Sequence, residues 1–149
     1  MVTWAAKVRH WNGWGYVGEE PGPAAIERWR QTTGVLAGVR GDDYRPPVAL
    51  EDLRLPEPRL KPEPGGRLPG LSGFKGRIVA TSYERALHAA GRSTGDLIRL
   101  RSGTNLCFPD AVAYPADEDD LLRLLEFAAA RRVALIPTGG GSSVVGGIE

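Results

Sequence analysis

The sequence has 149 residues, 42% of them apolar and 25% charged, which suits one globular domain and excludes a collagen, a coiled coil or a wholly disordered tail. Nineteen basic and 18 acidic residues leave a net charge of +1 without a long run of one sign, so nucleic acid is not the default partner. The 20 Gly and 12 Pro predict many loops and short elements.

The first region, residues 1–38, contains all four tryptophans and is expected to be mainly helical. In Trp11-Asn12-Gly13-Trp14-Gly15-Tyr16, glycines let the backbone turn sharply while the rings pack elsewhere. A short helix should begin at Pro23 and end at Gly34. One face of that helix would carry Ile26, Trp29 and Thr33.

The second region, residues 39–76, has seven prolines between Pro46 and Pro69. Proline fixes its own φ and disfavours helix in the residue before it, so we expect an extended connector. A solvated linker is the favoured interpretation, and a segment that wraps along another domain is the alternative.

The third region, residues 77–105, is predicted to hold two helices that lead into the last region. Ser82 is expected to cap the first helix, and Gly91 to end it. Ser93 or Thr94 should cap the second, which would stop at Gly103. The apolar face of the first helix would consist of Tyr83, Ala86, Leu87 and Ala90.

The last region, residues 106–149, is predicted to form strand, helix, strand. Residues 111–114 and 133–136 are the short apolar strands, and Asp117 should cap the helix between them. This makes one right-handed, parallel βαβ unit, and the fold class is therefore α/β (α+β). The apolar helix face would be formed by Leu121, Leu122, Leu125, Ala128 and Ala129.

A glycine-rich loop directly follows the second predicted strand. Its glycines permit positive φ, so that successive N–H groups can surround an anion, and it has no acidic side chain to repel a diphosphate. It lacks the lysine of a Walker A loop and the sixth-position glycine of a Rossmann fingerprint. The alternative is a turn that merely connects strands. The predicted cofactor-binding residues are Pro137, Thr138, Gly139, Gly140, Gly141, Ser142, Ser143 and Val144.

Order and spacing from Pro109 to Val144 resemble the entrance of the PCMH-type FAD-binding domain of vanillyl-alcohol-oxidase-like flavoproteins, in which the FAD pyrophosphate lies on this loop. The tryptophan motif of residues 11–16 is similar to the N-terminal signature of the alkyldihydroxyacetonephosphate synthase branch. Ser142 stands where that family is expected to have Thr, which keeps the hydroxyl. The lead-in also resembles that branch at Arg85, His88, Gly91, Ser93, Asp96, Leu97, Arg99, Leu100, Arg101 and Gly103.

The resemblance implies an FAD-dependent enzyme of ether lipid biosynthesis that exchanges the acyl group of a dihydroxyacetone phosphate ester for an alkyl group through a flavin N5 adduct. FAD would be non-covalent, because the loop has no His to attach it. No catalytic residue is assigned: the family's catalytic region and substrate domain would lie after Glu149, so we expect an N-terminal fragment that binds FAD weakly or not at all alone. An FAD-linked oxidase or dehydrogenase of a 2-hydroxy acid or alcohol, and a non-catalytic interaction module, are the alternatives.

The remaining residues indicate less about function. Cys107 is expected to be a small buried side chain in a reducing compartment. His10 and His88 have no ligand cluster around them, so no metal site is predicted, and His88 should be a hydrogen-bonded structural residue. The acidic run at residues 117–120 suits a helix N-terminus. We expect a cytoplasmic protein with no secretory signal and no membrane-spanning segment, and a homodimer is left open.

Overall fold

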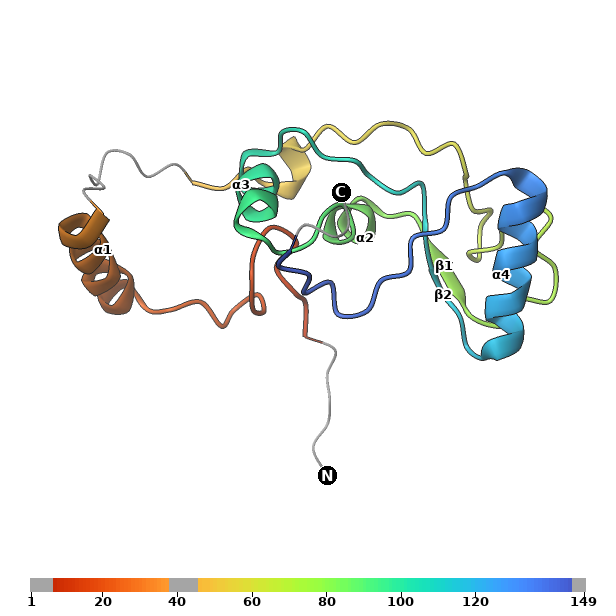
Figure 1. Cartoon of the computed structure of the whole chain (residues 1–149), viewed down its shortest axis with the longest axis horizontal. Helices are drawn as coiled ribbons and strands as arrows, with labels where there is room; N and C mark the ends of the chain where they lie inside the picture. The colour runs from red at the N-terminus through yellow and green to blue at the C-terminus, as the bar shows by residue number, and fades with distance from the viewer. Residues whose placement is uncertain (1–6, 38–45, 146–149) are drawn as a thin grey trace, which may run out of the picture.

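The computed structural model describes residues 7–37 and 46–145. It has four α-helices, a short 3-10 helix and a two-stranded sheet in these ranges. Two small hydrophobic clusters form the core, one around α2 and α3 and one beside α4 (Figure 1). In chain order the elements are α1 (Pro23–Ala37), η2 (Leu50–Asp52), β1 (Arg77–Val79), α2 (Ser82–Leu87), α3 (Thr94–Ser102), β2 (Val112–Tyr114) and α4 (Glu118–Arg131).

The tryptophan motif folds as a tight turn that is closed by an isolated antiparallel bridge between Arg9 and Tyr16. Trp11 is buried in this turn, whereas Trp14 is exposed. Helix α1 begins at Pro23 as predicted, but it continues through Gly34 to Ala37. None of its residues is buried, and it lies apart from the rest of the molecule (Figure 1). A glycine inside a helix lowers stability without ending it, which is why the stop predicted at Gly34 is wrong.

The connector is not a solvated linker over residues 46–76. It has little regular structure, as expected, but it runs along both hydrophobic clusters. Leu68 and Leu71 are buried beside α4, and Leu53 packs near α2 and α3. The connector therefore packs along the two hydrophobic clusters of its own chain, and its predicted wrapping along another domain stays a prediction. Proline prevents helix and sheet hydrogen bonding, but it does not prevent the intervening leucines from being buried.

The two lead-in helices have well-defined ends. Thr81, not Ser82, caps α2 by accepting a hydrogen bond from the Glu84 N–H. Ser93 and Asp96 form a reciprocal capping box at α3, and Gly103 ends that helix with φ of 66°. The predicted apolar face of α2 is confirmed, because Ala86 and Ala90 are buried together with Trp11 and Leu100. These last four residues define the lead-in cluster.

The sheet differs from the predicted parallel βαβ unit. Strand β2 is present, but its partner is β1, and the two strands are antiparallel with Ile78 opposite Ala113. Residues 133–136 have no strand structure, and Leu135 and Ile136 are exposed. An apolar run becomes a strand only when a neighbour completes its hydrogen bonds, and among the described residues none lies beside this run. The βαβ prediction is therefore wrong for this chain.

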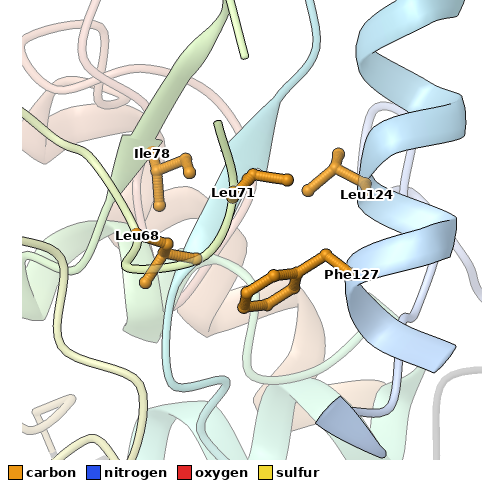
Figure 2. Packing of buried hydrophobic residues seen from close by; sticks show 5 residues of the cluster. All are labelled: Leu68, Leu71, Ile78, Leu124 and Phe127. Carbon is orange, nitrogen blue, oxygen red and sulfur yellow. The ribbon is translucent and has the colours of Figure 1, made fainter. Parts of the chain in front are cut away.

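Helix α4 packs mainly through a different face from the one predicted, although Ala128 of the predicted face is buried. Leu124 and Phe127 project from α4 toward Leu68 and Leu71, and Ile78 of β1 completes this α4 cluster (Figure 2). By contrast, three leucines of the predicted apolar face are about half exposed. These exposed leucines are Leu121, Leu122 and Leu125. Because α4 is apolar on two sides, periodicity alone could not show which side faces the core.

Asp120 connects the first turn of α4 to the preceding loops through side-chain hydrogen bonds. Its fully buried carboxylate accepts hydrogen bonds from the main-chain N–H groups of Lys75, Gly76 and Ala116 at 2.8–2.9 Å. Asp117 caps the helix by accepting from the Asp120 N–H, as predicted. The acidic run at residues 117–120 therefore does more than complement the helix dipole, because the buried Asp120 carboxylate also binds main-chain N–H groups of the preceding loops.

Cys107 is exposed rather than buried. It lies in the extended segment between α3 and β2, where Leu106 and Phe108 turn toward the lead-in cluster. Side chains alternate in extended backbone, so the cysteine between them faces outward.

Candidate functional site: the glycine-rich loop

Residues 133–145 run from the end of α4 back toward the N-terminal turn beside α2 and α3 (Figure 1). Within this stretch the backbone folds around an open hollow of about 320 Å³. All of its lining comes from consecutive residues of the loop, namely Pro137, Thr138, Gly139, Gly140, Gly141, Ser142 and Ser143. Seven of the eight predicted cofactor-binding residues are thus brought together, while Val144 is exposed outside the lining.

The loop glycines are not required by packing within the chain. A Cβ added at Gly139 would meet nothing within 4 Å, and one at Gly140 would meet only the Ser142 Oγ at 4.0 Å. Gly141 has φ of 65°, which favours glycine for conformational reasons. The space above the first two glycines is therefore open for a group from outside the described residues.

The polar groups of the loop also remain available. Within the described ranges, no main-chain N–H of residues 138–143 donates to another residue. The lining contains three hydroxyl groups and no carboxylate. A diphosphate such as that of FAD fits a loop that offers free main-chain N–H donors, hydroxyl groups and glycines without side chains.

One end of the loop is attached to the lead-in helices. The carbonyl oxygen of Ser143 accepts a hydrogen bond from the main-chain N–H of Arg92, at 2.5 Å. A Cβ on Gly91 would lie 2.8 Å from that same oxygen, so only glycine allows the approach. The sequence predicted that Gly91 would end a helix, but α2 already ends at Leu87. This attachment had no signal in the sequence, because it joins residues that only the fold brings together.

The Arg92 side chain lies behind this attachment and is 2% exposed. Its guanidinium donates to main-chain carbonyls of Trp11 and Gly13 in the N-terminal turn, and to those of Ala90 and Gly91 beside it. Burial, the largest influence, lowers the pKa of Arg92 from its usual value. Sequence reasoning did not identify Arg92, since nothing in the sequence marks an arginine as buried.

The remaining titratable residues do not add to the loop site. The Nδ1 of His88 lies 2.8 Å from the Glu84 carbonyl oxygen, and its ring contacts Tyr114 edge-on, in agreement with the predicted structural role. His10 lies 3.2 Å from a carboxylate oxygen of Glu20. Across residues 7–37 and 46–145, no three side chains of metal-ligating type are grouped. No helix in the part of the chain that the structure describes has the length and apolarity to cross a bilayer.

Comparison with known protein families assigns the last part of the chain. Residues 109–149 match the model of an FAD binding domain. This range includes β2, α4 and the whole glycine-rich loop.

Comparison with individual proteins extends the relationship along the chain. An alkyldihydroxyacetonephosphate synthase from Trypanosoma brucei brucei is 30% identical over 167 aligned residues, which cover all of this chain and 27% of the relative. The synthase of Dictyostelium discoideum is 32% identical over 72% of this chain and 17% of its own length. A solved structure of alkyldihydroxyacetonephosphate synthase superposes with a TM-score of 0.69 and 26% identity, over 95% of this chain and 30% of that one. The chain therefore spans under a third of the relatives it matches.

Proposed function

We propose that this chain, an FAD-binding domain protein related to alkyldihydroxyacetonephosphate synthase over part of that enzyme's length, holds the FAD diphosphate on residues 137–144. The observation that carries the proposal is the open space above Gly139 and Gly140. Where packing within the chain does not require glycine, close approach of a ligand to the backbone is a physical reason for it.

The diphosphate would be bound by the main-chain N–H groups of the loop together with the hydroxyls of Thr138, Ser142 and Ser143. N–H donors that have no acceptor among the described residues lose little when a charged phosphate oxygen replaces water. Glycine at residues 139 and 140 lets the phosphate oxygens reach the backbone. Binding would be non-covalent, since the loop contains no His or Cys that could attach the flavin.

By its relatives, the full-length protein would act as an alkyldihydroxyacetonephosphate synthase. That reaction would exchange an acyl for an alkyl group on dihydroxyacetone phosphate, and the flavin, when bound, would supply the electron-accepting ring that this chemistry needs. The described residues would bind the diphosphate, and their packing would hold the diphosphate in position. The substrate would be a lipid.

The test uses Gly139→Ala and Gly140→Ala in the full-length protein, with the FAD dissociation constant measured by flavin fluorescence. An added methyl group occupies open space in the apoprotein, so the unfolding midpoint without FAD should not change. It should weaken FAD binding about tenfold or more, because it blocks approach to the backbone.

The matched control is Gly95→Ala in α3, where the added Cβ would meet only the Ser93 Oγ at 3.8 Å. This variant should bind FAD as the wild type does. Unchanged FAD affinity in both loop variants would show that the diphosphate is bound elsewhere. Acyl-to-alkyl exchange by the FAD-loaded full-length protein tests the activity separately.

A further inference from the structure

We propose that Arg92, together with Gly91, is a positioning residue for the cofactor loop: it fixes Ser143 against the N-terminal tryptophan turn. The proposal rests on the function proposed above, because it assigns the loop to FAD. It adds a role for the region before residue 109, which lies outside the match to the FAD binding domain.

Gly91 lies in close contact with the loop. A Cβ at Gly91 would lie 2.8 Å from the Ser143 carbonyl oxygen and 3.3 Å from the Ser143 Cβ. It would also lie 2.9 Å from a carboxylate oxygen of Asp96, which is itself held in the α3 capping box. Gly91 is thus enclosed between the loop and a carboxylate that the capping box holds in place.

A hydrogen bond also runs from the Arg92 N–H to the Ser143 carbonyl. It is the main-chain hydrogen bond that joins residues 137–145 to the lead-in helices within the described part of the chain. Since the amides of residues 138–143 have no acceptor among residues 7–37 and 46–145, this bond at the end of the loop is what positions them relative to the lead-in helices.

The Arg92 guanidinium is buried although no carboxylate of the described residues forms an ion pair with it. It donates instead to the carbonyl oxygens of Trp11 and Gly13 in the tryptophan turn and to that of Gly91, which lies beside the contact with the loop. The planar guanidinium can hold several carbonyls in fixed directions at once, which a lysine ammonium cannot do in the same geometry. Displacing it would leave buried carbonyls without donors.

These contacts form one continuous connection from the tryptophan turn through Arg92 to Ser143. The indole of Trp11 packs in the lead-in cluster with Ala86, Ala90 and Leu100, so the turn is itself held by buried apolar contacts. A loop whose end is fixed before the ligand arrives loses less conformational entropy on binding. The tryptophan turn would therefore raise FAD affinity without touching FAD.

The experiment compares Gly91→Ala and Arg92→Lys with the control Gly95→Ala in the full-length protein. Two readouts are measured below the unfolding midpoint of each apoprotein: hydrogen exchange at the Arg92 amide and the FAD dissociation constant. We expect Gly91→Ala to accelerate exchange at Arg92, and both variants to weaken FAD binding about tenfold, with kcat recovering at saturating FAD. Gly95→Ala should match the wild type in both readouts.

The outcome that overturns the inference is a Gly91→Ala variant with a faster-exchanging Arg92 amide and an FAD affinity within about twofold of the wild type. Apoproteins that are destabilised by either substitution, yet bind FAD normally, would overturn it as well, because they would show a purely structural role. The Gly139→Ala result separates the two proposals. If that variant weakens FAD binding and the Arg92 and Gly91 variants do not, only the positioning role fails.

Discussion

The phenol of Tyr114 donates a hydrogen bond of 2.6 Å to a carboxylate oxygen of Glu84. Tyr114 ends β2, beside the α4 cluster, and Glu84 lies in the first turn of α2, which packs in the lead-in cluster. The bond therefore links the two hydrophobic clusters of the molecule through a polar contact. The Arg77 guanidinium lies over the Tyr114 ring, 4.0 Å from its centre, and 3.9 Å from the other carboxylate oxygen of Glu84.

The Tyr114 phenol should titrate above the usual pH range of a tyrosine. Burial, and then the hydrogen bond to the Glu84 carboxylate, raise its pKa from 10 to about 12. Because the folded-state pKa is the higher one, the stabilisation is complete below pH 10 and is lost as the pH rises from 10 toward 12. Tyrosinate absorbance at 295 nm during a pH titration measures this directly.

Tyr114→Phe provides the comparison for that titration. It removes the hydroxyl but keeps the ring under Arg77, so the high-pH titration step should disappear and the loss of stability between pH 10 and 12 should become smaller. An unchanged absorbance curve in the variant would mean that the late-titrating group is another tyrosine.

Asp120→Asn should destabilise the chain. One amide oxygen cannot replace two carboxylate oxygens that accept from Lys75, Gly76 and Ala116, and the amide N–H₂ would face donors. We expect the thermal midpoint to fall by roughly 5 °C or more. Asp119→Asn is the matched control, because Asp119 is exposed and makes only a distant ion pair of 3.8 Å with Lys75.

Asp120 should also influence how the free energy of unfolding depends on pH in acid. Burial acts to raise its pKa, but the hydrogen bonds from the amides of Ala116, Lys75 and Gly76 outweigh it, so the pKa lies below the usual 3.8. A depressed folded-state pKa gives stability that is present above pH 3.8 and is lost as the pH falls below it. Urea unfolding of Asp120→Asn at pH 3 to 6 should therefore show a flatter pH dependence than the wild type. A parallel shift of the whole curve would argue against this role.

The two sides of α4 should respond differently to truncation. Leu124 is 7% exposed and Leu122 is 59% exposed. Leu124→Ala should lower the free energy of unfolding of the 149-residue chain by roughly 2–4 kcal/mol, because it leaves a cavity against Leu68 and Leu71. Leu122→Ala should change it by less than about 1 kcal/mol. Chemical denaturation measures both, and equal losses would place both leucines in the core.

Cys107 should react readily with a thiol reagent in the folded protein. Its side chain is exposed, so a thiol assay without denaturant should modify it at a rate close to that in urea. Much slower labelling in the native state would mean that Cys107 is covered in solution.

Local signals in the sequence predicted local structure well. Pro23 marks the start of α1, Ser93 and Gly103 bound α3, and Asp117 caps α4. Each of these residues acts on backbone groups a few positions away, so the sequence contains all that is needed. The glycine-rich loop could also be recognised from the sequence because residues 137–143, which line the hollow, are contiguous in the chain; that residues 137–144 bind a cofactor stays a prediction.

Long-range relationships could not be predicted in the same way. Strand β2 pairs with β1, some 35 positions earlier in the chain, and not with the apolar run that follows α4. The two candidate partners are both short apolar segments, and nothing in the sequence shows which of them pairs with β2. The choice of Leu124 and Phe127 over Leu121 and Leu125 depends on where the connector lies. The attachment of Ser143 to Arg92 likewise exists only once α2 and the loop are in place.

The buried leucines of the connector have a consequence for how the chain acquires its structure. Leu68 and Leu71 are buried against Leu124 and Phe127 of α4, which follow them late in the chain, together with Ile78 of β1. The Asp120 carboxylate likewise binds the N–H of Lys75, 45 residues before it in the sequence. During synthesis, the connector therefore emerges well before the helix that covers it. Contacts of such long sequence separation slow folding, so we expect this part of the molecule to form late and to be the stage most exposed to aggregation.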